Sequence, residues 1–395
     1  MKPVRVGVFG LLGSGNLGND GSLEAVLRHL RDRHPSVTVD ALCGGPEAVT
    51  AKFGIPATRL HWYRGEYRTA SRAGSIAGKG IGKLVDVFRT AAWVRRHDVV
   101  IVPGMGVLEA TLPLRPWGFP YALFLLCASG RLLGTRVALV CVGAAGIGNP
   151  ATRALVRWSA RLAAYRSYRD DRARDAMRAM GVDTSRDEVY PDLAFSLPVP
   201  SGTPSGTVCV GVMDFHGGDD DRARADEIHG RYLDGTIRFV RVLVGEGRPV
   251  RLLTGDTCDA SVVAAILDAV DSPLVTAAEP ASLADLMAET AAAESVVAVR
   301  YHNLICALKT GTPVLALSYA AKSDALMAGM GVGAYCHPAR AVDADRLLEQ
   351  FRELEKNAPA VRATLAEHNR EAARRLESQF AALTTVLYPS SQEAP

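Results

Sequence analysis

Arg300, Tyr301 and His302 follow one another directly after the apolar run 296–299. Such a run is typical of a strand buried on both faces of a parallel sheet, and residues 303–309 fit a short helix after it. Alternation along an extended chain places Arg300 and His302 on the same side. A fixed cation, a titratable imidazole and a helix N-terminus together form an anion-binding site. A second interpretation stays open, in which Arg300 pairs with a carboxylate and His302 caps the helix.

Strands and helices are predicted to alternate along the chain around these residues. Amphipathic stretches between apolar runs predict the helices, and residues 343–388 fit two more at the carboxyl end. The alternation favours parallel, doubly wound sheets, so the expected fold class is α/β. The apolar runs predict strands at 4–9, 37–42, 98–102, 137–142, 208–212, 250–254, 296–299 and 314–317.

The length of the chain indicates two domains, because 395 residues are many for one hydrophobic core. Residues 199–206 are rich in Pro, Gly and Ser, which is typical of a linker. We therefore expect one Rossmann-like domain at 1–198 and a second at 207–388, which includes the carboxyl-terminal helices. Asp214 and His216 follow the first strand of the second domain and mark a further candidate position for a site.

Several stretches resemble motifs of the polysaccharide pyruvyl transferase family, and together they cover most of the chain. They are a carboxyl-terminal Arg-x-His before a short helix and a Gly-x-Pro-Val strand, a Ser-Tyr-x-x-Lys, and an Arg-Asp. An amino-terminal Gly-x-x-Asn-x-Gly-Asp, whose acid is displaced by one position, and a strand that ends in glycines are also similar. The residues that carry the resemblance are Gly13, Asn16, Gly18, Asp20, Gly104, Gly106, Arg169, Arg300, His302 and Lys322.

The resemblance implies a fold, a reaction and a partner. The fold would be that of B-type glycosyltransferases, with a cleft between an acceptor-side first domain and a donor-side second domain. The reaction would transfer the pyruvyl group of phosphoenolpyruvate to sugar hydroxyls, giving a ketal and free phosphate. Phosphoenolpyruvate is then the donor substrate, a sugar or lipid-linked glycan is the acceptor, and no cofactor or metal ion is expected.

The implied chemistry assigns roles to the matching residues. The methylene carbon of the donor must be protonated, and His302 is the candidate general acid. The acceptor hydroxyl needs a base, for which Glu109 and Asp20 are the candidates, and Glu109 is also placed to contact acceptor hydroxyls. The phosphate and carboxylate of the donor need fixed cations, and the candidates are Arg169, Arg300 and Lys322.

Other interpretations of the same residues remain. The first glycine turn contains a literal G-x-G-x-x-G, which would bind a nicotinamide cofactor with Asp40 on its ribose. That fingerprint should begin where the strand ends, near Gly10, yet it starts three residues later. Residues 19–21 are poor helix formers, so we expect the helix to begin at about Ser22. A glycosyltransferase that uses a nucleotide sugar and a non-catalytic binding protein are the further alternatives.

Composition narrows the class of partner. The net charge of +3 gives no indication of nucleic-acid binding. Seven cysteines form no C-x-x-C pair, so neither a zinc site nor a disulfide framework is indicated, and a reducing cytoplasm fits. Residues 59–96 hold nine Arg or Lys, which is typical of a solvated loop or of a surface for anionic glycans or for lipids at the inner face of the membrane. The acceptor and the oligomeric state do not follow from the sequence.

Overall fold

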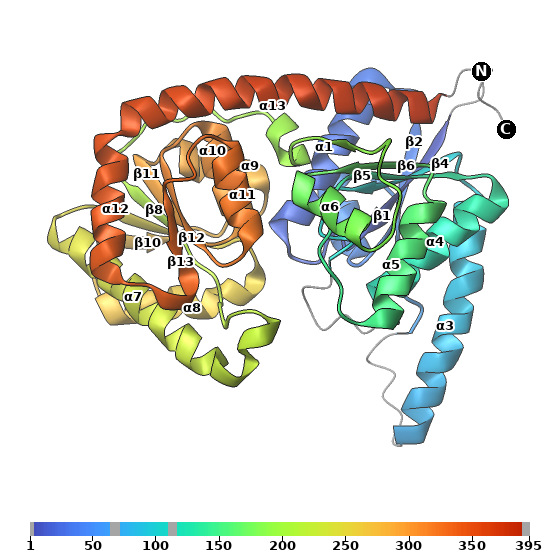
Figure 1. Cartoon of the computed structure of the whole chain (residues 1–395), viewed down its shortest axis with the longest axis horizontal. Coiled ribbons are helices and arrows are strands. Elements are labelled where there is room, and N and C mark those ends of the chain that lie inside the picture. Colours follow the sequence, from blue (N-terminus) through green and yellow to red (C-terminus); the bar gives the residue numbers. More distant parts are fainter. Residues whose placement is uncertain (1–3, 64–71, 110–116, 389–395) are drawn as a thin grey trace. The chain divides into compact units, whose positions relative to one another are not determined.

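The computed structural model describes residues 4–63, 72–109 and 117–388 (Figure 1). The chain divides into two compact units, each with its own parallel sheet and helices, which confirms the α/β class with two Rossmann-like domains. The expected domain bounds, 1–198 and 207–388, stay a prediction. The first unit comprises Met1–Ser14, Ser22–Leu193 and Arg375–Pro395, and the second comprises Gly15–Gly21 and Ala194–Arg374.

Within the described residues, the sheet of the first unit has seven parallel strands in the order β3-β2-β1-β4-β5-β6-β7. The winding changes direction between β1 and β4, which pair with each other. Ligands of doubly wound folds bind at the carboxyl ends of the strands at such a switch point. The strands are β1 (Arg5–Gly10), β2 (Thr38–Cys43), β3 (Ala57–Arg59), β4 (Val99–Pro103), β5 (Arg136–Val142), β6 (Tyr165–Tyr168) and β7 (Glu188–Val189).

The helices of the first unit cover this sheet. Helix α4 contacts both α3 and α5, and it buries an apolar face that includes Leu123, Leu126 and Cys127 (Figure 1). The helices are α1 (Leu17–Arg33), α2 (Pro46–Phe53), α3 (Arg72–Val94), α4 (Phe119–Leu133), α5 (Pro150–Leu162) and α6 (Asp171–Ala179). The first residues of α1, up to Gly21, belong to the second unit.

The second unit repeats the same plan with six parallel strands, counted over the part of the chain that the structure describes. Their order is β10-β9-β8-β11-β12-β13, so the switch point lies between β8 and β11. The strands are β8 (Val208–Gly211), β9 (Val250–Leu253), β10 (Val275–Ala277), β11 (Ser295–Ala298), β12 (Val314–Ser318) and β13 (Cys336–Pro338).

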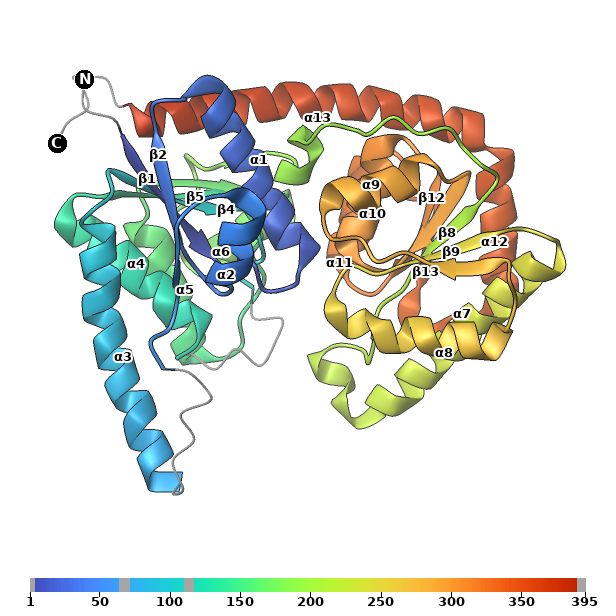
Figure 2. The same ribbon diagram turned by 180° about the vertical axis from the view of Figure 1, so that it is seen from behind.

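The helices of the second unit include two groups that pack together, as the two opposite views show. Helix α7 contacts α8 and α12, and α9 contacts α10 (Figures 1 and 2). Helix α13 contributes residues up to Arg374 to this unit and its later residues to the first unit. The helices are α7 (Ala225–Gly245), α8 (Ala260–Val270), α9 (Leu283–Ala291), α10 (Tyr301–Thr310), α11 (Ala321–Gly329), α12 (Ala344–Lys356) and α13 (Ala358–Leu387).

The central strands form the core of each unit. Every residue of β4 and of β11 is buried, as expected for strands with helices on both faces of the sheet. Gly311 ends α10 in the left-handed conformation, with φ of 74°, which glycine adopts readily at a helix end. The seven cysteines are free thiols, and Cys258 is the exposed one.

Two helices begin earlier than the sequence predicted. Helix α1 begins at Leu17 rather than near Ser22, because the Asn16 side chain accepts hydrogen bonds from the N–H groups of Gly18 and Asn19 at 3.1 and 3.2 Å. This cap outweighs the weak helix propensity of the residues that follow. Helix α10 begins at Tyr301, so the expected alternation of Arg300 and His302 along an extended chain is wrong.

The described part of the basic region is mostly helical rather than a loop. Helix α3 runs through its glycines, while Arg64 and Arg68 lie outside the described residues and only the backbone of Arg72 is described. Among the helices described, none combines the length and the apolar character needed to cross a bilayer.

Candidate active site

Arg300 stands at the carboxyl end of β11, immediately before α10, and its guanidinium is paired with a buried carboxylate. Its Nε lies 2.9 Å from Asp259 Oδ2 and its Nη2 lies 2.5 Å from Asp259 Oδ1. Burial lowers the pKa of Arg300, but the hydrogen bonds and charge of Asp259 outweigh it, so the net shift is upward. The second interpretation of Arg300, pairing with a carboxylate, is therefore what the structure shows.

The Asp259 carboxylate joins three loops at the carboxyl edge of the second sheet. Besides Arg300, it accepts the backbone N–H groups of Asp214, Gly255 and Asp256 at 3.1 to 3.2 Å. Asp214 follows β8, and Gly255 and Asp256 follow β9. Because Asp259 is fully buried, these bonds fix the backbone around Arg300. No local pattern in the sequence marks Asp259 as a site residue.

His302 lies in the first turn of α10, half-buried, with its ring edge-on to Tyr301 at 5.5 Å between centroids. The backbone of Gly18 lies against this imidazole. A Cβ on Gly18 would fall 1.9 Å from His302 Cε1 and 2.0 Å from Nδ1, so no larger residue fits there without movement. Asn16, in the same turn, donates to Asp256 at 3.4 Å. The structure thus brings the amino-terminal glycine motif and the Arg-x-His motif into one site.

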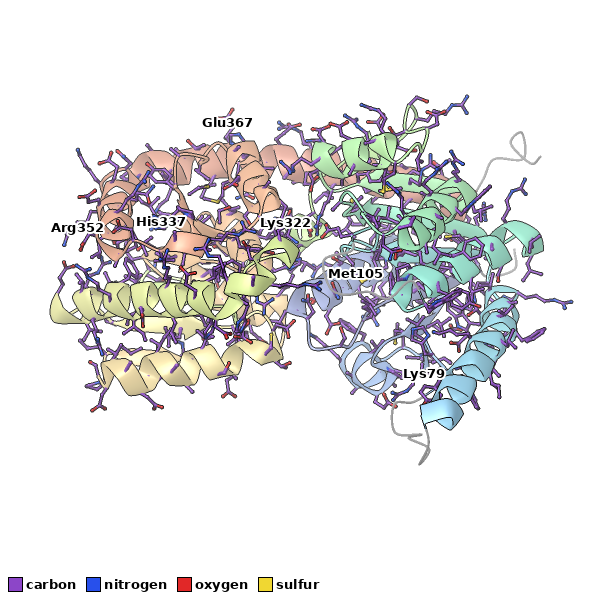
Figure 3. The ribbon with its side chains drawn as sticks, turned by 60° about the horizontal axis from the view of Figure 1, so that its bottom comes forward. Lys79, Met105, Lys322, His337, Arg352 and Glu367 are labelled. Carbon is purple, nitrogen blue, oxygen red and sulfur yellow. The ribbon has the colours of Figure 1, made fainter. Side chains whose placement is uncertain are left out.

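Lys322 joins the same site from the first turn of α11. Its Nζ lies 5.7 Å from the ring centre of Tyr301 and 5.6 Å from that of Tyr319 (Figure 3 labels Lys322). These distances are within the range of cation–π attraction. The ammonium group is therefore held near the helix start that carries His302.

Asn303 is a site residue that the sequence marked only as part of a helix turn. Its side chain is fully buried, and neither amide atom has a hydrogen-bond partner among the described residues. A Cβ on Gly211 would lie 2.6 Å from its Nδ2, and one on Gly255 would lie 2.9 Å from its Oδ1. A buried amide without partners is rare and costly, so this group is suited to bonding a ligand or water.

A second cluster lies in the first unit, at the carboxyl end of β4. Glu109 and Arg169 form a buried ion pair at 2.5 Å, and the Arg169 Nε is 3.7 Å from Asp170. Side chains at Gly106 and Gly143 would clash with the pair, with built Cβ atoms 2.9 and 2.4 Å from Glu109. The sequence proposed separate roles for Glu109 and Arg169, whereas the structure places them in direct contact.

The local packing accounts for three other candidate residues. Gly13 has φ of 68°, and a Cβ there would lie 2.3 Å from the carbonyl oxygen of Gly45, so close backbone packing explains this glycine. Gly104 has φ of 54°, and a Cβ there would lie 2.4 Å from the Ser22 side-chain oxygen. Asp20 is buried in the first turn of α1. Their proposed roles in substrate binding stay predictions.

Comparison with known proteins identifies both a family and a fold. The family model described as polysaccharide pyruvyl transferase matches residues 16–320. No curated protein matches the chain. A solved UDP-N-acetylglucosamine 2-epimerase is 14% identical with a TM-score of 0.65, covering 100% of this chain and 99% of that one.

Two further solved structures have the same fold. The UDP-GlcNAc 2-epimerase of Neisseria meningitidis, bound to UDP-GlcNAc, is 11% identical with a TM-score of 0.64, and the alignment covers 98% of this chain and all of that one. The S. aureus MnaA–UDP structure is 12% identical with a TM-score of 0.61 and coverage of 100% and 99%. At these identities the likeness shows the fold alone.

Proposed function

Because this chain belongs to the polysaccharide pyruvyl transferase family, we propose that it moves the pyruvyl group of phosphoenolpyruvate onto two hydroxyls of a sugar unit. The products would be a ketal and free phosphate. The observation that carries the proposal is the contact of Gly18 with His302, since it joins two segments that resemble the family's motifs.

The proposed reaction balances without a cofactor. The methylene carbon of the donor gains a proton and becomes a methyl group, and the neighbouring carbon accepts one hydroxyl oxygen. The bond from that carbon to the phosphate oxygen then breaks, and the second hydroxyl oxygen takes its place. In the balanced reaction, one of the two hydroxyl protons is transferred to the methyl group and the other to the phosphate. His302 is the proposed general acid, because its half-buried imidazole stands at the switch-point edge of the second sheet.

Donor anions would bind at the amino end of α10. Asp259 accepts two of the five N–H donors of Arg300 and Cys258 Sγ accepts a third, so two remain for a phosphate or carboxylate. Lys322, the N–H groups of the first helical turn and the Asn303 amide add further donors. Glu109 of the first unit and Asp20 of the second remain the proposed bases, and Arg169 of the first unit remains the proposed additional cation.

Ligand binding and turnover of single variants test this proposal. Phosphoenolpyruvate should raise the midpoint of thermal unfolding, whereas NAD and nucleotide sugars should not. His302→Gln should lower kcat for phosphate release by roughly 10²–10⁴-fold with little change in KM. Arg300→Ala should mainly raise KM for phosphoenolpyruvate.

Each alternative has its own result in the same experiments. A larger thermal shift with UDP-sugars would favour the nucleotide-sugar glycosyltransferase, and one with NAD would favour the cofactor interpretation. Binding of phosphoenolpyruvate without phosphate release in the presence of glycan acceptors would favour a binding protein. Near-normal turnover of His302→Gln would remove the acid role.

We also propose that the enzyme binds its acceptor at the inner face of the membrane, where α3 would lie on anionic lipid. Ile81, Leu84 and Phe88 are 56, 65 and 74% exposed, and their spacing places them on one face of α3. The one carboxylate among the described side chains of α3, Asp86, is buried and bonded to His61. An exposed apolar face without carboxylates is typical of helices that lie in a membrane interface.

The charges around α3 favour a membrane over a second copy of the chain. Lys79 projects from α3 (labelled in Figure 3), and Arg95 and Arg96 are exposed just after the helix. A two-fold interface would bring these cations together, whereas anionic head groups attract them. The triple change Ile81→Ser, Leu84→Ser and Phe88→Ser should abolish sedimentation with phosphatidylglycerol vesicles, and Leu132→Ser, also at an exposed leucine, should not. Equal sedimentation of all variants would contradict the proposal.

A further inference from the structure

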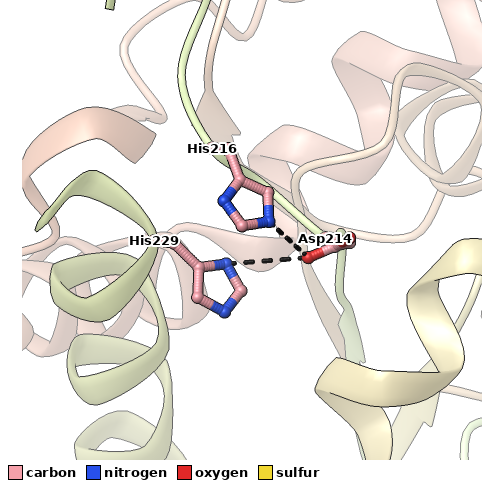
Figure 4. Close-up of side chains that lie close together, drawn as sticks. All are labelled: Asp214, His216 and His229. Carbon is pink, nitrogen blue, oxygen red and sulfur yellow. Dashed lines mark hydrogen bonds and ion pairs between the residues drawn. The ribbon is translucent and has the colours of Figure 1, made fainter. Parts of the chain in front are cut away.

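Three side chains with metal-binding atoms converge at the carboxyl edge of the second sheet (Figure 4). Asp214 and His216 lie in the loop after β8, and His229 lies in the second turn of α7. The sequence analysis marked the first two as a candidate position for a site but expected no metal ion. Strand β8 borders the switch point, where doubly wound folds bind ligands.

The distances suit one metal ion bound by all three side chains. His216 Nε2 lies 2.9 Å and His229 Nδ1 lies 3.7 Å from the same oxygen, Oδ1 of Asp214. The three metal-binding atoms all lie within 4.8 Å of one another. Two ligand atoms on one transition-metal ion, each about 2.1 Å from it, can be up to about 4.2 Å apart. A small side-chain movement would therefore let one ion contact all three.

The two imidazoles are side by side rather than paired with separate partners. Their rings are stacked at 4.3 Å between centroids and 8° between planes, with the Asp214 carboxylate at their edge. His229 Nδ1 is also 3.2 Å from the carbonyl oxygen of Phe215, which places a backbone oxygen beside the cluster. Two nitrogens and one carboxylate thus face a common point.

The loop that carries Asp214 and His216 is held by buried groups. Met213 N–H donates to the Tyr232 hydroxyl at 3.1 Å, and Asp214 N–H donates to Asp259 at 3.1 Å. The Phe215 ring is buried and lies 5.9 Å from the Tyr232 ring centre. A fixed backbone lowers the cost of gathering the ligands, as a metal site requires.

From this donor set and its rigid support we propose that Asp214, His216 and His229 bind a divalent transition-metal ion of the zinc class. Two imidazoles and one carboxylate suit Zn²⁺, Co²⁺ or Ni²⁺, whereas Mg²⁺ and Ca²⁺ prefer oxygen ligands throughout. Three protein ligands leave a coordination position for water or an oxygen of a bound ligand. The proposal is independent of pyruvyl transfer, which as written needs no metal ion.

The site also adjoins the anion site through one shared carboxylate. Asp259 accepts the N–H of Asp214 and pairs with Arg300, so the metal-binding loop and the guanidinium have a common support. A cation bound at this edge adds positive charge next to the amino end of α10. We therefore expect bound Zn²⁺ to tighten phosphate binding, a coupling that can be measured without turnover.

Calorimetric titration of the full chain with Zn²⁺, and separately with Co²⁺, tests the site. The wild type should bind one equivalent of metal ion. Asp214→Asn, His216→Gln and His229→Gln should each weaken metal affinity at least about 10–100-fold, because that is the loss seen when a residue that only hydrogen-bonds to a metal ligand is changed. His368→Gln, a histidine on α13 outside the cluster, is the matched control and should bind as wild type does. His216 is the most exposed of the three side chains, so its variant should keep the native fold.

Cys258 is the competing ligand to exclude. It is an exposed residue whose Sγ lies 3.1 Å from Arg300 Nη2, and partial desolvation of the thiol raises its pKa, so it is a poor thiolate ligand at neutral pH. Cys258→Ser should retain the full binding of Zn²⁺ and Co²⁺. Loss of binding in Cys258→Ser, unchanged binding in all three cluster variants, or absence of binding by the folded wild type would each overturn the proposal.

Discussion

Gly18→Ala is the change that most directly tests the candidate active site. The added methyl group would fall 1.9 Å from His302 Cε1, 2.0 Å from Nδ1 and 2.3 Å from Nε2. Carbon atoms in contact are normally about 3.5–4.0 Å apart, so the imidazole must move by roughly 1.5 Å or the helix must shift. The change therefore displaces the proposed acid without altering any chemical group of the site.

The expected effect on stability is small and the effect on activity large. Alanine favours the helix over glycine by about 1 kcal/mol, while overpacking costs about 1–3 kcal/mol, so the two largely cancel. A catalytic group misplaced by about 1 Å can lose roughly 10²-fold in rate. We expect Gly18→Ala to fold normally and to lower kcat for phosphate release about 100-fold.

The assay is phosphate release from phosphoenolpyruvate with a glycan acceptor, together with thermal unfolding. Gly245→Ala is the matched control, because a Cβ there meets nothing within 4 Å, and it should be fully active. If Gly18 acts through His302, the double variant with His302→Ala should be no slower than His302→Ala alone. Full activity of Gly18→Ala, or additive losses in the double variant, would refute the reasoning.

Three further predictions concern stability. The His29 ring stacks on that of Phe380 at 4.4 Å between centroids. Burial, followed by the charge of His34, lowers the pKa of His29 from 6.5 to about 4, so in this pH range the unfolded chain binds more protons than the folded chain. The free energy of unfolding should therefore fall by roughly 1–3 kcal/mol as the pH drops from 6.5 to 4. His29→Phe should flatten that slope in denaturant unfolding, and an unchanged slope would contradict this. Asp259→Asn should cost about 3–5 kcal/mol, since it leaves the guanidinium it supports without a counter-charge, and a loss below 1 kcal/mol would show that the pair is dispensable. Glu109→Gln should destabilise by a similar amount because Arg169 is buried beside it, and co-substitution with Arg169→Met should recover most of the loss.

Local pattern predicted the longer strands, but it predicted neither the helix starts nor the short strands β3, β6, β7, β10 and β13. The buried strands β4 and β11 were predictable because every residue in them is apolar or small and packs under helices. The start of α1 was not, because the side chain of Asn16 caps the helix and overrides the propensities of the next residues. His302 was assigned to the correct motif but to an extended backbone rather than a helical one.

The partners within the site depend on strand order, which the local sequence does not encode. Arg300 meets Asp259, 41 positions before it in the sequence, because β11 and β9 flank β8 in the sheet. Glu109 meets Arg169 across 60 residues for a similar reason. Motif resemblance located the cations, whereas the carboxylates that hold them needed the folded chain.

The membership of residues Gly15–Gly21 in the second unit has a consequence for domain exchange. Chimeras of two family members joined near residue 193 would take Gly18 from one parent and His302 from the other. The imidazole would then face a backbone that did not evolve with it, although each sheet remained intact. A transplant of the second unit should therefore carry seven residues from the amino terminus with it, grafted between β1 and the body of α1.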